Sequence, residues 1–88
     1  DEKYLFYKKI IVEDVNFIPF DKLTGEMRVK AKLRYRHNEQ PATICPYENG
    51  TVMIEFDEPQ RAPSPGQSAV FYDGDIVVGG GKIVKGIR

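Results

Sequence analysis

The segment RVKAKLRYR, residues 28–36, alternates cationic and apolar residues without interruption. Successive side chains of a β-strand point to opposite faces, so this pattern separates the apolar residues from the cations. A helix would scatter both sets around its axis. The segment therefore predicts a half-buried strand with Val29, Ala31, Leu33 and Tyr35 facing the core and Arg28, Lys30, Lys32, Arg34 and Arg36 facing outward.

A hairpin is predicted directly after this strand. Residues 42–47 have strand character, although Pro46 belongs at an end, an edge or a bulge because proline cannot donate to a ladder. Asn49-Gly50 accepts the positive φ angles of a type I′ turn. Residues 51–56 then alternate again. The sequence thus predicts that 42–47 and 51–56 pair antiparallel.

On the N-terminal side, residues 10–18 are rich in β-branched and aromatic side chains and predict a strand bent near Asp14. Residues 20–26 contain turn formers and predict a loop that leads into the cationic strand.

The C-terminal third is divided by prolines and glycines. The segment 59–67 holds three prolines and predicts an ordered surface loop. Strands are predicted at 68–72 and 76–78, joined by a turn at Asp73-Gly74-Asp75. Gly79-Gly80-Gly81 interrupts the pattern before 82–84, as expected at a bend or bulge that leaves no space for Cβ atoms.

Together these segments predict an all-β fold, a small antiparallel barrel of about six strands formed by one domain, residues 1–88. No amphipathic helix of normal length is apparent in the sequence. We expect a filled interior with no lumen for a ligand. Its predicted side chains are Val29, Leu33, Ile44, Val52, Ile54, Phe56, Val70, Tyr72 and Val77.

The amino-acid composition limits the kinds of function that the chain can have. The chain has 41% hydrophobic and 30% charged residues, which is typical of a folded domain. Its 13 lysines and arginines balance 13 acids, so any RNA or membrane role must rest on a local patch. No apolar run approaches the roughly 20 residues that span a bilayer, and the single cysteine suits a reducing compartment. We expect a soluble, cytoplasmic protein.

Residues for catalysis, metal binding or cofactor binding are sparse. One histidine, His37, would have to serve any triad, and Cys45 has no second cysteine or cation run beside it. The run Gly79-Gly80-Gly81-Lys82 departs from the phosphate-loop spacing and lacks the following hydroxyl residue. We therefore expect neither a catalytic centre nor a metal or cofactor site in this chain.

The cationic strand is the strongest functional signal. It contains no acid, whereas between His37 and Asp75 the only Lys or Arg is Arg61. Alternate side chains on a strand lie about 6.6 to 6.8 Å apart, close to the phosphate spacing of a single-stranded nucleic acid. Two readings stay open: docking of a polyanion or protein, or a solvated face, including a sheet edge protected by charge. The candidate RNA-binding residues are Lys30, Lys32, Arg34, Arg36 and Arg61.

Several motifs occur together in one order, at 10–16, 31–36, 56–62, 65–75 and 79–81. In this combination the sequence resembles the C-terminal domain of the tRNA-specific 2-thiouridylases, the MnmA/TrmU family. Two positions depart from the family pattern: His37 stands where Gln is common, and Pro63-Ser64 replaces an aliphatic residue and Thr or Ala. These departures bear on the contacts of the exposed loop rather than on the fold.

The resemblance implies a barrel similar to the second domain of translation elongation factors. It also implies a larger parent enzyme, a tRNA-uridine 2-sulfurtransferase that uses ATP and persulfide sulfur at the wobble uridine. The ATP loop and catalytic cysteines of the family belong to its N-terminal part, so this chain would be a non-catalytic fragment. Its implied partners are the tRNA anticodon arm, the catalytic domain and a sulfur-donor protein. The alternative is a structural domain that braces the catalytic domain without RNA contact.

Overall fold

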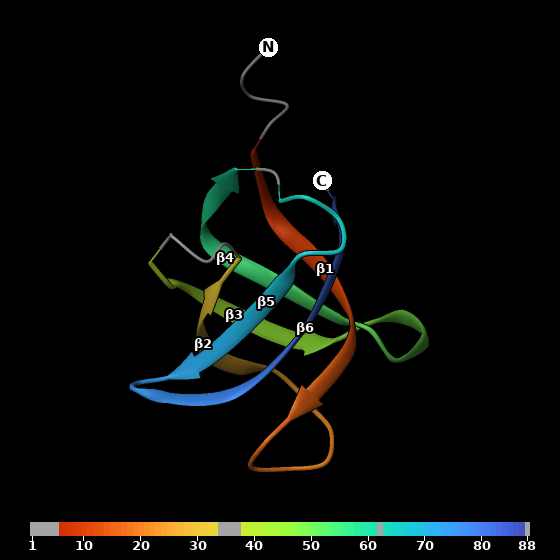
Figure 1. Cartoon of the computed structure of the whole chain (residues 1–88), viewed down its shortest axis with the longest axis vertical. Helices are drawn as coiled ribbons and strands as arrows, with labels where there is room; N and C mark the ends of the chain where they lie inside the picture. The colour runs from red at the N-terminus through yellow and green to blue at the C-terminus, as the bar shows by residue number, and fades with distance from the viewer. Residues whose placement is uncertain (1–5, 34–37, 62, 88) are drawn as a thin grey trace.

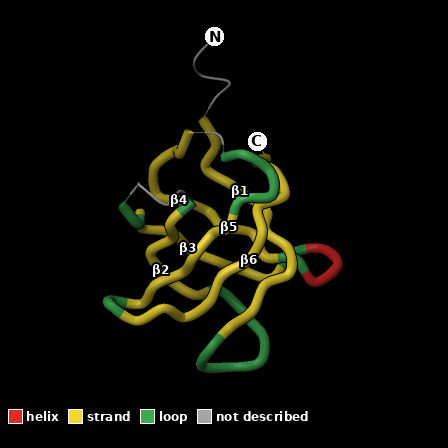
Figure 2. The backbone as a smooth tube through the Cα atoms, viewed as in Figure 1, coloured by secondary structure: helices red, strands yellow, loops and turns green. Residues whose placement is uncertain are grey.

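The computed structural model describes residues 6–33, 38–61 and 63–87. Within these residues it contains six strands and one short 3₁₀ turn, which confirms the predicted all-β class (Figure 2). The strands are β1 (Phe6–Phe17), β2 (Met27–Lys32), β3 (Gln40–Pro46), β4 (Val52–Arg61), β5 (Ser68–Asp73) and β6 (Ile76–Ile87).

The strands close into a barrel in the order β1-β4-β3-β2-β5-β6 (Figure 1). Every neighbouring pair is antiparallel. Although β1 comes first in the chain, it lies between β4 and β6. Because the sheet closes on itself, each strand has hydrogen-bonded neighbours on both sides, and no strand presents a free edge in the described part of the chain.

The core fills the barrel and largely follows the predicted alternation. On β2, Val29 and Ala31 are buried, while Arg28 and Lys30 are exposed. Leu33 is buried just beyond the end of this strand. The rest of the predicted strand, Arg34, Tyr35 and Arg36, lies outside the described residues. The prediction is confirmed for six interior residues: Val29, Leu33, Ile44, Val52, Ile54 and Phe56.

The predicted orientation of β5 and of the start of β6 is wrong by one residue. Ala69 and Phe71 are buried, whereas Val70 and Tyr72 lie on the outer face. On β6 it is Val78 that is buried, and Val77 is 40% exposed. Because Ala69-Val70-Phe71-Tyr72 has apolar or aromatic residues on both alternating sets, periodicity alone does not select the inner face.

The β3–β4 hairpin forms as predicted. Asn49 and Gly50 have φ angles of 55° and 79°. The Thr51 N–H donates to the Glu48 carbonyl over 3.1 Å, closing a turn around these two residues. Asparagine and glycine are the residues that tolerate two successive positive φ angles, so they fix the hairpin at this point.

The glycine run lies inside β6, so the predicted interruption of the strand is wrong, but the predicted lack of space is confirmed. A Cβ atom on Gly79 would lie 2.5 Å from the Asn16 carbonyl oxygen, and one on Gly80 would lie 2.6 Å from the Ala69 carbonyl oxygen. These neighbours are backbone atoms of β1 and β5, which flank β6. Only glycine therefore lets the three strands pack at this distance.

Two further features shape the barrel wall. The bend predicted near Asp14 is confirmed: Asp14 has a φ of 51°, and the β1–β6 register shifts between Glu13 and Asn16. The prediction that residues 59–67 form only a loop is wrong, because β4 continues to Arg61. The β1–β4 register jumps between Tyr7 and Lys9. Pro59 lies in the unpaired part of β4, where it has no ladder bond to donate.

Candidate functional site

Two of the predicted RNA-binding residues lie on the outer face of β2. Lys30 is exposed and Lys32 is half-buried. Opposite them on β5 lie Tyr72, paired with Lys30, and Val70, paired with Lys32. In the described part of the chain, the ammonium groups of both lysines have no hydrogen-bond or ion-pair partner. Because β2 pairs with both β3 and β5, these cations do not protect a sheet edge, and that reading is wrong.

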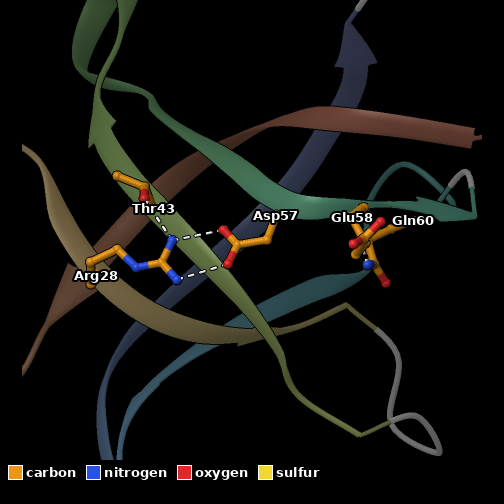
Figure 3. Close-up of polar contacts among 5 residues, drawn as sticks. All are labelled: Arg28, Thr43, Asp57, Glu58 and Gln60. Carbon is orange, nitrogen blue, oxygen red and sulfur yellow. Dashed lines mark hydrogen bonds and ion pairs between the residues drawn. The ribbon is translucent and has the colours of Figure 1, made fainter.

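Arg28 lies on the same face but has a partner (Figure 3). Its guanidinium donates to both carboxylate oxygens of Asp57, over 2.7 and 2.9 Å, and to the Thr43 hydroxyl over 3.0 Å. The three residues come from β2, β3 and β4, which are adjacent in the barrel. The hydrogen bonds raise the pKa of Arg28 and lower the pKa of Asp57. Arg28 is therefore neutralised in place and differs from Lys30 and Lys32.

Arg61 is exposed at the last residue of β4. Because β2 and β4 are both antiparallel to β3, they end at the same end of the barrel (Figure 1). The structure thus places Arg61 at the end where Lys32 lies, with β3 between their strands. Arg34 and Arg36, together with His37, lie outside the described residues.

A hollow lies beside Lys32 that sequence reasoning missed. It has a volume of about 520 Å³ and is lined by Lys32, Leu33, Val70, Tyr72 and residues 66–68. Val70 and Tyr72 line it because they lie on the outer face of β5, the opposite of the predicted orientation. Its lining combines apolar residues with the polar residues Lys32, Gln67 and Ser68.

The residues 64–67 form a fixed turn at the rim of this hollow. The Gln67 N–H donates to the Ser64 carbonyl over 3.2 Å, and Gly66 has a φ of 89°, the geometry of a type II turn. Two backbone hydrogen bonds attach the turn to β6: Gly66 N–H to the Ile83 carbonyl at 2.8 Å, and Ile83 N–H to the Gln67 carbonyl at 2.7 Å. The rim is therefore held in one conformation relative to the barrel.

Cys45, the acidic side chains and the glycine run are the other groups that sequence analysis considered. Burial, with the charges of Glu26 and Glu55, raises the pKa of the Cys45 thiol, which keeps it protonated near neutral pH. Within residues 6–33, 38–61 and 63–87, no three His, Cys, Asp or Glu side chains are grouped to hold a metal ion. Gly79–Gly81 pair with residues of β1 and β5 in the barrel wall and do not form a phosphate-binding loop. The described residues include no helix that could span a membrane.

Comparisons with known proteins agree on one family. The family described as "Aminomethyltransferase beta-barrel domain" matches residues 7–83. The tRNA-specific 2-thiouridylase MnmA 1 of Thermoanaerobacter sp. (strain X514) is 58% identical over 84 residues, which are 96% of this chain and 23% of that protein. The tRNA-specific 2-thiouridylase MnmA of Acetivibrio thermocellus is 58% identical over 83 residues, 94% of this chain and 23% of its own length.

A third relative, the tRNA-specific 2-thiouridylase MnmA of Clostridioides difficile (strain 630), is 53% identical over 87 residues, 99% of this chain and 24% of that protein. The chain thus spans about a quarter of the length of the curated relatives that it matches.

Proposed function

The chain belongs to the aminomethyltransferase beta-barrel domain family and matches the C-terminal domain of the tRNA-specific 2-thiouridylases, and from this premise we propose that it docks tRNA for such an enzyme. In this proposal the barrel is a non-catalytic accessory domain. Lys30 and Lys32 bind phosphate groups of the anticodon arm, and Arg61 contributes from the same end of the barrel. Arg34 and Arg36 continue the same cationic run in the sequence.

The proposal extends to the whole protein that contains this domain. That protein replaces the C2 oxygen of the wobble uridine with sulfur, using ATP and a persulfide supplied by a sulfur-donor protein in the cytoplasm. The barrel itself takes no part in the chemistry, because its glycine run lies within a paired strand and its one cysteine is held as a thiol. Residues of the catalytic domain supply the ATP site.

The observation that carries the proposal is the contrast between cations on one strand face. Arg28 donates to Asp57, whereas Lys30 and Lys32 have no partner among the described residues. An ammonium group without a protein partner is available to a phosphate and gains a charge-assisted hydrogen bond on contact. Such contacts position an RNA without reading its sequence, as expected of an accessory domain.

The test is a fluorescence-anisotropy titration of the 88-residue chain with a labelled tRNA anticodon stem-loop at several salt concentrations. Four phosphate contacts, one each by Lys30, Lys32, Arg34 and Arg36, predict a log–log salt slope of about −3 to −4. Lys30→Ala with Lys32→Ala should weaken binding and reduce the magnitude of the slope by about 1.5. The matched control is Lys22→Ala with Lys85→Ala, which removes the same charge from exposed positions on a loop and on β6.

A control variant that loses as much affinity and slope as the β2 variant would show general electrostatic attraction instead of docking on β2. Unchanged affinity and slope in the β2 variant would also contradict the proposal.

A second candidate function is bracing of the catalytic domain without RNA contact. Two large aliphatic side chains near one end of the barrel support it: Ile18 is 73% exposed and Ile76 is 68% exposed. The Ile18 N–H donates to the Val78 carbonyl, so residue 18 lies beside the start of β6. Exposed apolar side chains at one place are typical of a surface that another part of a protein covers.

The bracing function predicts no binding of the stem-loop at low salt by either the native chain or the β2 variant. It also predicts that Ile18→Ser with Ile76→Ser, introduced into a longer protein that carries the catalytic domain, lowers its thermal stability. The same substitutions should leave the isolated barrel nearly unchanged, because both side chains are already largely exposed to water.

A further inference from the structure

We propose that the hollow beside Lys32 is a binding site for one unstacked nucleotide of an RNA strand. The inference rests on the proposed tRNA docking and assigns a second kind of contact to the same wall of the barrel. Phosphate binding by Lys30 and Lys32 needs only charge. The hollow adds surfaces that recognise a base.

Its size and lining suit a small, flat, partly polar ligand. A volume of about 520 Å³ falls within the range of roughly 300 to 1,000 Å³ that is typical of small-molecule sites. Leu33 and Val70 give it apolar walls, and Tyr72 contributes an aromatic ring. Aromatic side chains accept any base by stacking, because every base has a π-face.

Two polar residues at the hollow, Lys32 and Gln67, suit the phosphate and the base edge of a nucleotide. Lys32 lines the hollow, and its ammonium group has no partner among the described residues, so it is available for the phosphate. The Gln67 side-chain oxygen accepts from the Ser64 N–H over 3.3 Å. This contact leaves the amide NH₂ group of Gln67 able to donate to a carbonyl or ring nitrogen at the edge of a base.

The site is preorganised and continuous with the docking face. The turn that carries Gln67 is held to β6 by two backbone hydrogen bonds, so little ordering is required on binding. Lys30 lies directly opposite Tyr72 across the β2–β5 ladder. A strand whose phosphates follow Lys30 and Lys32 therefore passes the opening of the hollow. Charge complementarity favours an anionic ligand over an apolar peptide segment, and Tyr72 in the lining favours an anion that carries bases over an acidic peptide.

The experiment compares two labelled probes by fluorescence anisotropy with the 88-residue chain. One probe is a pentamer of uridylates, and the other is a pentamer of the same ribose phosphates without bases. Both carry the same charge, so phosphate docking alone gives equal affinity. A nucleotide site predicts binding of the base-containing pentamer that is tighter by about fivefold or more.

Substitutions separate the two kinds of contact. Tyr72→Ala and, independently, Gln67→Ala should bring the affinity ratio of the two probes toward one. Gln67 lies on an exposed turn, so Gln67→Ala should leave the barrel folded. This variant therefore tests the site even if Tyr72→Ala destabilises the barrel. Lys30→Ala should weaken the binding of both probes equally and preserve the ratio of their affinities. Amide resonances of residues 66–70 should shift on addition of the base-containing probe.

Each alternative result has a distinct meaning. Equal affinity for both probes overturns the nucleotide site while the phosphate docking stands. Base-dependent binding whose NMR shifts map away from residues 66–70 overturns the site as well. Failure of either probe to bind at low salt overturns the docking function and the nucleotide site together.

Discussion

The two sides of the barrel are built differently. Every ladder that involves β1 or β6 contains a register shift: β1–β4, β1–β6 and β5–β6. The ladders β2–β3, β2–β5 and β3–β4 have continuous registers. The irregular side holds the positive φ of Asp14 and the glycine run. The regular side holds the Arg28–Asp57 pair, and Lys30 and Lys32, which have no partner among the described residues.

A small barrel must both close on itself and hold side chains at regular positions, and this barrel meets the two requirements on different strands. Six strands close only if the wall bends sharply, and bulges with glycines supply that bend. The ladders of β2 and β3 contain no register shift, so these two strands keep uninterrupted alternation. An uninterrupted strand holds its outward side chains at a fixed spacing, which is the property that a row of phosphate contacts needs.

The irregular side should be the more sensitive to added atoms. Gly79→Ala places a Cβ 2.5 Å from the Asn16 carbonyl oxygen and 2.8 Å from Phe17 Cδ1, so β1 and β6 must separate. We expect a loss of about 3 kcal/mol or more in the free energy of unfolding, measured by urea denaturation. Gly25→Ala is the control, because nothing lies within 4 Å of its added Cβ. Equal losses in the two variants would contradict the comparison.

The stability of the regular side should depend on how completely side chains fill the core rather than on close contact between strand backbones. Ile44 on β3 is fully buried, with 0% of its surface exposed. Ile44→Val should lower the free energy of unfolding by about 1 kcal/mol through loss of one packed methyl group. Ile76→Val removes the same group from a side chain that is 68% exposed and should change it by less than about 0.5 kcal/mol. A larger loss at Ile76 would mean that this end of the barrel is packed in solution.

The smallest effect is expected at the Arg28–Asp57 pair, because both side chains are largely exposed. The pKa of Asp57 is lowered in the folded state, so the stability it contributes is present above its ordinary value of 3.8 and is lost as the pH falls through the folded value. Asp57→Asn should therefore lower the thermal midpoint slightly at neutral pH. The difference should shrink in thermal melts as the pH is lowered below 3.8. A difference that persists there would assign the effect to packing rather than to charge.

Local patterns predicted most of the fold. Alternation along residues 28–33 identified the inner face of β2, and Asn49-Gly50 identified a hairpin whose φ angles the structure confirms. The orientation of β5 was wrong because its apolar residues occupy both alternating sets. Its inner face is selected by the partners that it meets, such as Ala31 opposite Phe71. Nor did composition reveal that β4 continues past Pro59, since β1 supplies the pairing there.

The candidate site was predicted only in part for a similar reason. The lysines of β2 were identified by their charge and spacing, and the structure places them on the outer face. The neutralisation of Arg28 depends on Asp57, 29 residues away in the sequence. The hollow depends on a turn that hydrogen bonds to Ile83. Contacts of this kind arise from barrel closure and leave no periodic signal.

The position of β1 between β4 and β6 determines when the molecule can fold. During synthesis β1 leaves the ribosome before the other five strands, yet Lys9 must wait for Ile87 before the β1–β6 ladder can form. Until then β1 can pair with β4, but the edge of β1 that pairs with β6 is unsatisfied and exposed to misassociation with other nascent chains. We therefore expect the barrel to fold late and cooperatively, in milliseconds to seconds as is typical of all-β topologies with distant pairings.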